Sequence, residues 1–499
     1  MSTAIQKYLS QTKTENINSA FLSYIASLEE ISKVSPEISK SIVSELREQR
    51  SNLKLIASEN YSSLASQLAM GNLLTDKYAE GYANHRFYAG CQNVDDIESL
   101  AINEAKKLFG CDHAYVQPHS GADANMVAYW AILTAKVENV ALEELGEKNP
   151  SKLSQKDWES IRQKLGNQKL LGLDYYSGGH LTHGYRMNVS AKMFDAYSYT
   201  VNKETGILDY DEIEKMAQDI KPLILLAGYS AYPRKIDFKR MREIADSVGA
   251  VFMVDMAHFA GLVAGGVFEG NYNPIDHAHV VTTTTHKTLR GPRGGMVLCK
   301  KEFAEVVDKG CPLVLGGPLP HVMAAKAIAF IEANKPEFKT YGQNIVKNSR
   351  ALAQYCKEEG MDIATDGTDN HLFLIDVRNF SLTGRQAESV LRECGITLNR
   401  NALPFDPNGP WYTSGLRIGT PATTTLGMND DAMKEIAAII KLVLENTKPT
   451  AAADGKASLA KYEIDSSVQN EALKKVKVLL DRYPVYPELD LDFLIENFA

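Results

Sequence analysis

Short apolar runs alternate with amphipathic helical patterns in the middle of the chain. Four runs have the length and apolar or β-branched character of strands: PLILLA (222–227), AVFMVD (250–255), HVVTTTT (279–285) and GGMVLCK (294–300). A helical pattern over residues 239–248 separates the first two. Strands and helices that alternate in this way predict a mostly parallel sheet with both faces covered. We therefore expect an α/β fold.

The segments on either side of these runs predict a division into three parts. Residues 1–52 carry apolar positions at helical spacing but do not form a broad hydrophobic face. This pattern predicts a helical arm that packs against another surface. Residues 53–320 are expected to form a large domain, with a charged helical insertion at about 136–170. Residues 321–499 are expected to form a smaller α/β domain, interrupted by a low-complexity linker near 447–460.

Composition and charge narrow the classes of function. The 499 residues are 44% hydrophobic and 23% charged, as in ordinary globular proteins. The net charge of -8 gives no electrostatic reason to expect binding to nucleic acid or to an anionic membrane. Six scattered cysteines without a CxxC pair, and an N-terminus without a secretory signal, indicate reduced thiols in a cytoplasmic protein.

Chemically distinctive side chains stand at the predicted strand and helix ends. Lys287 follows the threonine run, and Asp255 closes the preceding strand with His258 three residues on. Ser120–Gly121 opens a helix after a strand, an arrangement that can cradle a phosphate. Arg417 lies in the glycine-flanked segment SGLRIGTPA and can approach a small carboxylate. These residues also have ordinary structural interpretations: Lys287 as a surface lysine, Asp255 as a helix cap or turn residue, and Arg417 as a surface residue of a turn.

A pair of histidines in the loop GGHLTHG leaves two kinds of ligand open. His180 and His183 could bind a metal ion, but no third ligand stands at the spacing of a zinc protease motif. We favour an organic ligand and expect no metal. A cofactor with an aldehyde, a basic ring nitrogen and a phosphate needs an amine, a carboxylate and an anion cradle, which describes pyridoxal phosphate.

Nine motifs between about Leu53 and Ala422 resemble those of the serine hydroxymethyltransferase family. They are LIASENY, DKYAEGY, QPHSGADAN, GGHLTHG, GYSAY, VDMAHFAGLVA, VVTTTTHKTLRGPRGG, TDNHLFLIDV and SGLRIGTPA. The resemblance implies a fold-type I pyridoxal-phosphate-dependent transferase, similar to aspartate aminotransferase, with a seven-stranded sheet. It also implies the reversible conversion of L-serine and tetrahydrofolate to glycine and 5,10-methylenetetrahydrofolate.

The resemblance assigns roles to three groups of residues. The expected catalytic residues are Lys287, Glu80, Asp255, His286 and Tyr78. The expected cofactor contacts, besides Lys287 and Asp255, are Ser120, Gly121, Ala122, His180, Ser230, His258, Thr284, Gly316 and Gly317. The expected contacts to the amino acid are Ser58, Tyr88 and Arg417, and those to tetrahydrofolate are Leu181, Gly179 and Asn401.

The resemblance also implies which part of the cofactor some of these residues contact. It implies that Lys287 forms the Schiff base, that Asp255 meets the pyridinium nitrogen, and that His258 stacks on the ring. Tyr78, Glu80 and Tyr88 come in the family from the neighbouring chain, as do Gly316 and Gly317. A homodimer is then the minimal active unit, with the N-terminal arm in the dimer contact, and a tetramer is open.

The chain also departs from the family pattern at several points. Phe87–Tyr88 replaces a tyrosine pair, HSGADAN replaces HSGSQAN, and Tyr175 stands where a leucine is usual. These changes bear on folate affinity more than on cofactor chemistry. The alternatives are a folate-independent aldolase or amino-acid racemase on the same fold, and an inactive or RNA-binding relative. The intact Lys287 and Asp255 and the acidic charge argue against the last.

Overall fold

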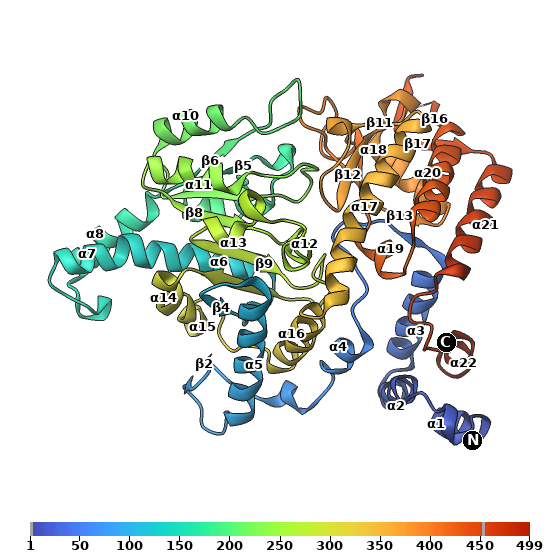
Figure 1. The fold of residues 1–499 in the computed structure, drawn as a ribbon, viewed down its shortest axis with the longest axis horizontal. Coiled ribbons are helices and arrows are strands. Elements are labelled where there is room, and N and C mark those ends of the chain that lie inside the picture. The colour runs from blue at the N-terminus through green and yellow to red at the C-terminus, as the bar shows by residue number, and fades with distance from the viewer. Residues whose placement is uncertain (1–2, 452–454) are drawn as a thin grey trace.

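A seven-stranded sheet forms the centre of the computed structural model, which describes residues 3–451 and 455–499 (Figure 1). Its order is β4 (His113–Tyr115), β10 (Gly295–Cys299), β9 (Val280–Thr284), β8 (Val251–Asp255), β7 (Ile224–Gly228), β5 (Lys169–Leu173) and β6 (Asp195–Tyr199). The strands from β9 to β6 are parallel, whereas β10 runs antiparallel to both neighbours. The predicted mostly parallel sheet is thus confirmed.

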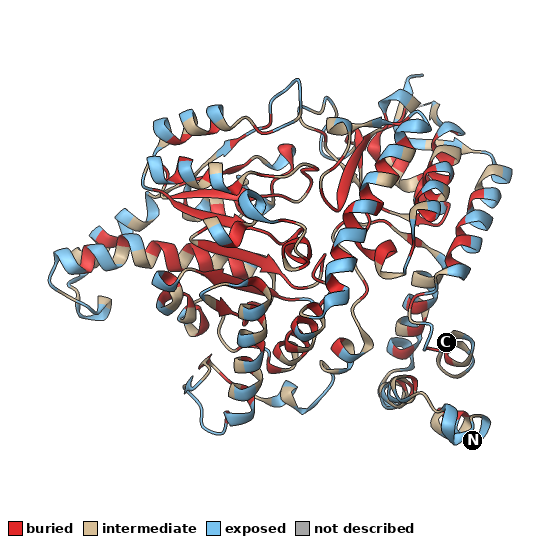
Figure 2. Cartoon of the chain, viewed as in Figure 1, coloured by how far each residue is buried: buried red, intermediate tan, exposed pale blue. Residues whose placement is uncertain are grey.

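Both faces of this sheet are buried under helices, as Figure 2 shows for the central strands. Because side chains alternate along a strand, Phe252 and Val254 of β8 face one core while Val251 and Met253 face the other. The first core is covered by α5 (Gln92–Phe109), α10 (Tyr210–Ile220), α11 (Phe238–Ser247), α12 (Ala260–Ala264) and α16 (Pro320–Ala333). The second is covered by α6 (Gly121–Leu133) and α14 (Ala304–Asp308).

A second sheet has a hydrophobic core of its own. Its order is β11 (Asp362–Ile363), β12 (Leu372–Asp376), β15 (Gly415–Gly419) and β14 (Asn399–Asn401). The helices around it are α17 (Pro336–Glu358), α18 (Gly384–Glu393), α20 (Asp430–Glu445) and α21 (Ser466–Arg482). The expected start of the large domain at residue 53 needs correction, because β1 (Leu53–Lys54) pairs with β13 (Ile396–Thr397) and buries Leu53 in this second core.

Three N-terminal helices pack against the C-terminal end of the chain. They are α1 (Ala4–Gln11), α2 (Ser19–Val34) and α3 (Pro36–Ser51), beside α22 (Leu491–Phe498) (Figure 1). The Phe21 ring centroid lies 5.1 Å from that of Tyr8 and 5.8 Å from that of Phe493, in edge-to-face geometry. These N-terminal residues are helical, and the C-terminal end of the same chain supplies much of the surface against which they pack. Their role in a dimer contact stays a prediction.

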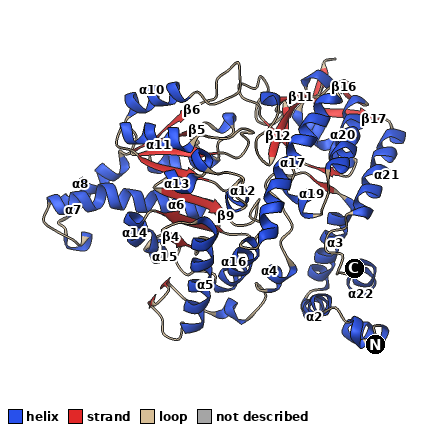
Figure 3. Ribbon diagram, viewed as in Figure 1, coloured by secondary structure: helices blue, strands red, loops and turns tan. Residues whose placement is uncertain are grey.

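The expected insertion is helical, and the expected linker is not a linker. Figure 3 shows the insertion as helices that project from the sheet: η3 (Thr134–Glu138), α7 (Asn139–Glu144), η4 (Pro150–Lys152) and α8 (Gln155–Gly166). The segment near 447–460 forms the antiparallel strands β16 (Thr447–Ala451) and β17 (Ala457–Ile464), and its residues 452–454 lie outside the described part. Gln386 Nε2 fixes β17 to α18 by donating to the carbonyls of Ser458 and Lys461.

The remaining elements are short and connect the larger ones. They are α4 (Leu64–Leu68), η2 (Leu73–Asp76), β2 (Gly81–Tyr82), β3 (His85–Arg86), η5 (Tyr175–Ser177), η6 (Leu181–His183), α9 (Ser190–Met193), η7 (Gly270–Tyr272), α13 (Pro274–His277), η8 (Lys301–Phe303), α15 (Gly310–Leu313), η9 (Ala364–Asp366), η10 (Arg378–Phe380), α19 (Pro421–Thr425) and η1 (Thr14–Asn16). Among the described residues, no helix combines the length and the apolar character needed to cross a membrane.

Candidate active site

The carboxyl ends of β7, β8 and β9 and the N-terminus of α6 open into a cavity of about 590 Å³. This is the edge at which open α/β sheets bind ligands. Most of the predicted site residues line the cavity: Ser58, Ser120, Gly121, Ala122, Gly179, His180, Leu181, Ser230, Asp255, His258, Thr284, His286, Lys287, Asn401 and Arg417. Five others, described below, do not.

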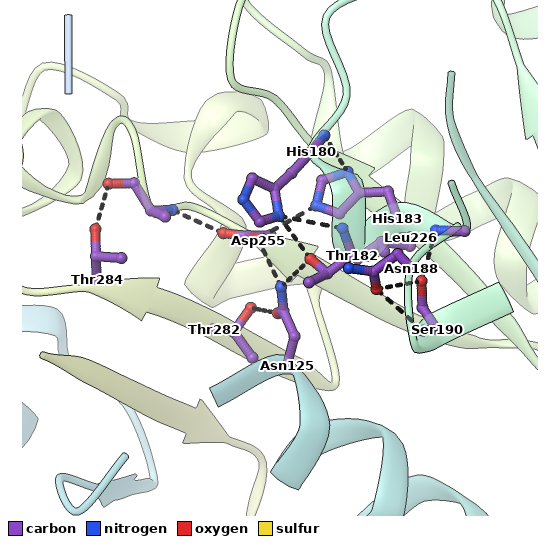
Figure 4. A network of polar contacts seen from close by, with 12 residues as sticks. Asn125, His180, Thr182, His183, Asn188, Ser190, Leu226, Asp255, Thr282 and Thr284 are labelled. Atoms are coloured by element: carbon purple, nitrogen blue, oxygen red, sulfur yellow. Dashed lines mark hydrogen bonds and ion pairs between the residues drawn. The ribbon is translucent and has the colours of Figure 1, made fainter. Parts of the chain in front are cut away.

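Asp255 is the most tightly held polar group of the cavity (Figure 4). Its Oδ2 accepts a hydrogen bond from Asn125 Nδ2 at 2.9 Å and lies 3.2 Å from His183 Nε2, while its Oδ1 accepts from the backbone N–H of Ala257 at 3.0 Å. Burial works to raise the pKa of this carboxyl, but the hydrogen bonds from His183 and Asn125 hold it below its usual range. Asp255 is therefore an ionised carboxylate in a buried site.

The hydrogen bonds around His183 decide which of its nitrogens carries the proton. His183 Nδ1 accepts from the backbone N–H of His180 at 3.3 Å, so the proton of the neutral ring lies on Nε2, which faces Asp255. His180, His183 and Asp255 offer possible metal ligands within 4.8 Å of one another. In this tautomer, however, the ring nitrogen nearest to Asp255 is a donor and is not available to a metal ion.

Asn125 is oriented by contacts on both sides of its amide. Thr282 Oγ1 donates to Asn125 Oδ1 at 2.5 Å, and Asn125 Nδ2 donates to Thr182 Oγ1 at 2.7 Å as well as to Asp255. This contact helps to explain why β9 is rich in threonine. Its β-branched residues suit a buried strand, and its hydroxyl groups form hydrogen bonds inside the protein. This amide fixes the carboxylate at one orientation.

Lys287 lies three residues beyond β9 with its side chain only 9% exposed, so the interpretation as a surface lysine is wrong. Burial lowers the pKa of its ammonium to about 8, although the charge of Asp255 works to raise it. Its backbone carbonyl accepts from Asn60 Nδ2 at 2.9 Å. Part of this amine is therefore neutral near physiological pH, and the neutral amine is the form that reacts with an aldehyde.

Arg417 reaches the cavity from β15 of the second sheet. Its Nη1 donates to the carbonyl of Ser230 at 2.7 Å and its Nε donates to Asn399 Oδ1 at 3.0 Å. Burial lowers the pKa of the guanidinium to about 10, where it is still charged at neutral pH. A guanidinium has five N–H groups, so Arg417 keeps donors for a carboxylate in the cavity.

His258 lines the cavity and contacts His371, which is buried. Its Nδ1 is 3.2 Å from His371 Nε2, and burial lowers the pKa of both rings, in His371 to about 3. Both rings are therefore neutral at physiological pH. An uncharged, flat ring at this place suits a contact with the face of an aromatic cofactor.

The start of α6 and the end of β9 make an anion cradle. Ser120 Oγ accepts from the backbone N–H of Asp123 at 3.1 Å, and its hydroxyl hydrogen can still donate. A Cβ at Gly121 would lie 2.7 Å from Thr284 Cγ2, so a glycine is needed there. Arg293 Nη1 donates to His286 Nε2 at 3.3 Å, and both residues line the same cavity.

The outer end of the cavity is aromatic. Leu181 and Tyr175 are each 41% exposed, and the Tyr175 ring centroid lies 5.3 Å from that of Tyr176 and 5.0 Å from that of Tyr185. A Cβ at Gly179 would lie 2.1 Å from the carbonyl oxygen of Leu173, so this loop needs glycine to pass the sheet edge. These residues form an entrance that suits a large, flat ligand.

Five predicted site residues lie outside this cavity, where they form a cluster of their own. The Tyr78 and Tyr88 rings are 4.9 Å apart and about half exposed, and a Cβ at Gly317 would lie 3.0 Å from the Tyr78 ring. Cys311 Sγ donates to the carbonyl of Gly316 at 2.7 Å, and burial raises the pKa of that thiol, with a smaller contribution from the charge of Glu80. A single chain therefore does not bring Tyr78, Glu80, Tyr88, Gly316 and Gly317 to its own Lys287.

Comparison with known proteins agrees with this geometry. The serine hydroxymethyltransferase family model matches residues 31–147 and 150–440. The chain belongs to the serine hydroxymethyltransferase family. The serine hydroxymethyltransferase of Treponema pallidum is 61% identical over 99% of this chain and 86% of its own length. Those of Salinispora tropica and Chlamydia trachomatis serovar D are 56% and 49% identical over 95% and 99% of this chain, and over 99% and 100% of their own lengths.

Four residues of the site were not singled out as site residues from the sequence. Asn125, Thr182 and His183 hold Asp255, directly or through one another, and Arg293 contacts His286. A signal was present for all four, since Asn125 ends the motif QPHSGADAN, Thr182 and His183 belong to GGHLTHG, and Arg293 belongs to GPRGG. Asn125 also stands one helical turn after Gly121, which places both on one face of the helix.

We expect the amine of Lys287 to react with pyridoxal phosphate at a rate that rises with pH and reaches half its maximum near pH 8. The reason is that only the neutral amine is nucleophilic, and burial lowers its pKa. Cofactor uptake by the apoenzyme, followed by absorbance across a pH series, measures this. In Asp255→Asn the midpoint should move to lower pH, because the carboxylate raises the pKa of Lys287. A wild-type midpoint above about pH 10, the value of an exposed lysine, would contradict the burial argument.

Proposed function

We propose that this chain transfers the hydroxymethyl group of L-serine to tetrahydrofolate and forms glycine and 5,10-methylenetetrahydrofolate, reversibly and with pyridoxal phosphate. Membership of the serine hydroxymethyltransferase family supports this activity. The single structural observation that carries it is a buried amine, Lys287, in one cavity with an ionised buried carboxylate, Asp255.

The described residues fit this cofactor at each of its functional groups. Lys287 would hold its aldehyde, Asp255 its ring nitrogen, and His258 a face of its ring. Ser120 and Gly121 at the N-terminus of α6 would hold its phosphate, since the free N–H groups of a helix start favour an anion. When bound, pyridoxal phosphate supplies a ring that withdraws electrons from the α-carbon of an amino acid.

Asp255 would keep a proton on the ring nitrogen. A carboxylate beside a basic nitrogen raises the pKa of that nitrogen, and the low pKa of Asp255 itself ensures that the carboxylate stays charged. His183 and Asn125 hold it in place. Asp255 would therefore hold a proton at the ring nitrogen, and a protonated ring is a better electron acceptor.

Arg417 would orient the amino acid by its carboxylate. Its guanidinium is fixed by Ser230 and Asn399 and keeps N–H groups for a bidentate contact. Ser58 lines the cavity near it and can add a hydroxyl donor. Leu181, Gly179 and Asn401 at the entrance would then take tetrahydrofolate, and Tyr175 adds an aromatic surface there.

Glu80 and Tyr78 would act in the cavity of a neighbouring chain, where Tyr88 would contact the amino-acid carboxylate. Their cluster beside Gly316 and Gly317 lies outside the cavity of their own chain, which supports a homodimer as the active unit. In that arrangement the carboxylate of Glu80 would take up and return the proton of the serine hydroxyl.

The six free cysteines also support a cytoplasmic location.

We expect purified enzyme to form glycine from serine only when tetrahydrofolate is present, and Lys287→Ala to lose at least about a thousandfold in this rate. The amine of Lys287 is the covalent anchor of the cofactor, so an alanine leaves no group to replace it. Glycine formation with and without tetrahydrofolate, measured by chromatography, tests this. Lys300→Met, which changes a lysine at the far end of β10, serves as the control.

Two outcomes would separate the proposal from its alternatives. Equal glycine formation with and without tetrahydrofolate would favour a folate-independent aldolase on the same fold. Conversion of one alanine enantiomer to the other as the main activity would favour a racemase. Wild-type protein that takes up no pyridoxal phosphate would remove the basis of the proposal altogether.

Subunit mixing tests the shared cavity. Glu80→Gln and Lys287→Ala should each be nearly inactive alone, because each removes one half of every site. Heterodimers of the two contain one cavity with both native residues, so activity should return to about a quarter of the wild-type rate when the chains mix randomly. Refolding the two variants together, with each refolded alone as control, measures the gain. No activity above the sum of the two separate samples would show that Glu80 acts within its own chain.

A further inference from the structure

Lys326 is a fully buried lysine outside the predicted site. Its side chain is 1% exposed, in the middle of α16. Its Nζ donates to three backbone carbonyls: Val116 at 2.6 Å, Pro118 at 2.9 Å and Gly295 at 2.8 Å. Lysine is almost never buried without a reason, so these three contacts need an explanation.

The three carbonyls belong to two segments that meet at the anion cradle. Val116 and Pro118 lead from β4 to Ser120, and Gly295 begins β10. The backbone N–H of Gly295 also donates to the Pro118 carbonyl at 2.9 Å. A Cβ at Gly295 would lie 2.1 Å from the Ser120 carbonyl oxygen, so the two segments touch. Lys326 therefore ties the turn before α6 to the start of β10.

The contacts around Lys326 extend to the segment that carries Lys287. The Gly294 carbonyl accepts from the backbone N–H of Thr285 at 3.0 Å, two residues before Lys287. A Cβ at Gly294 would lie 2.5 Å from Lys326 Cε, so the lysine stem fills the space beside that glycine. One side chain of α16 thus positions the anion cradle relative to the amine.

The hydrogen bonds favour the charged form of Lys326. Burial lowers the pKa of its ammonium to about 7, with Glu98 and Asp123 working to raise it. A neutral amine, however, has only two N–H groups and would leave one of three buried carbonyls unpaired. Glu98 is itself paired with Arg86. A buried positive charge with no carboxylate of its own is best balanced by an anion at the neighbouring cradle.

We propose that Lys326 is a positioning residue for the phosphate of the cofactor: it fixes the turn at Ser120 and supplies a buried positive charge behind the cradle. This inference rests on the proposed use of pyridoxal phosphate. It predicts that Lys326 contributes to the binding of the phosphate group and contributes little to the binding of the rest of the cofactor.

The test compares pyridoxal phosphate with pyridoxal, which has the same ring and aldehyde without the phosphate. In Lys326→Met the dissociation constant for pyridoxal phosphate should rise about tenfold or more, and that for pyridoxal should change less than about threefold. Absorbance titration of the apoenzyme with each compound measures both constants. Lys300→Met is the matched control, because Lys300 Nζ donates to a single carbonyl, that of Ile275, at the other end of β10.

The outcomes separate this inference from the proposed function. If Lys326→Met weakens the binding of both compounds equally, or weakens the binding of neither, the inference is overturned while the proposed function stands. Wild-type apoenzyme that binds neither compound would overturn the proposed function and this inference with it. Should Lys326→Met fail to fold, Lys326→Gln keeps two N–H donors without the charge, and the same selective loss for pyridoxal phosphate is expected.

Discussion

The contact between His183 and the Asp255 carboxylate is the interaction on which the site depends. A carboxylate that is 7% exposed would ordinarily take up a proton, because burial disfavours charge. Asp255 nevertheless stays ionised, because it accepts hydrogen bonds from a neutral imidazole, from the amide of Asn125 and from a backbone N–H. These donors come from the loop after β5, from α6 and from the turn after β8, so the packing of the large sheet is what keeps one buried charge in place.

The site also joins two hydrophobic cores. Asp255 ends β8 and Lys287 follows β9 of the seven-stranded sheet, whereas Arg417 belongs to β15 of the second sheet and reaches across to the Ser230 carbonyl. His258 and His371 meet across the same boundary at 3.2 Å. Lys287 and Arg417 therefore belong to parts of the chain with separate hydrophobic cores, and the contacts between these parts set the distance between the amine and the guanidinium.

The sequence predicted those features that depend on local patterns. The apolar runs gave β7 to β10, and the strand ends gave Asp255 and Lys287, because a parallel sheet brings its carboxyl ends together. Contacts between distant segments could not be predicted in this way. Asn125 and Lys326 look like ordinary helix residues until α6 and α16 are packed, and the pairing of β16 with β17 was hidden by their small residues. The motif resemblance supplied Glu80, Tyr78 and Tyr88, which no local pattern indicates.

An ionised Asp255 should hold a proton on the ring nitrogen of the cofactor. Nitrogen-15 NMR of the enzyme loaded with ring-labelled pyridoxal phosphate measures this protonation directly. We expect a protonated pyridinium signal that stays constant between about pH 6 and about pH 9, and its loss in Asp255→Asn. A neutral pyridine signal in the wild-type enzyme anywhere in that range would contradict the role assigned to Asp255 and to the residues that hold it.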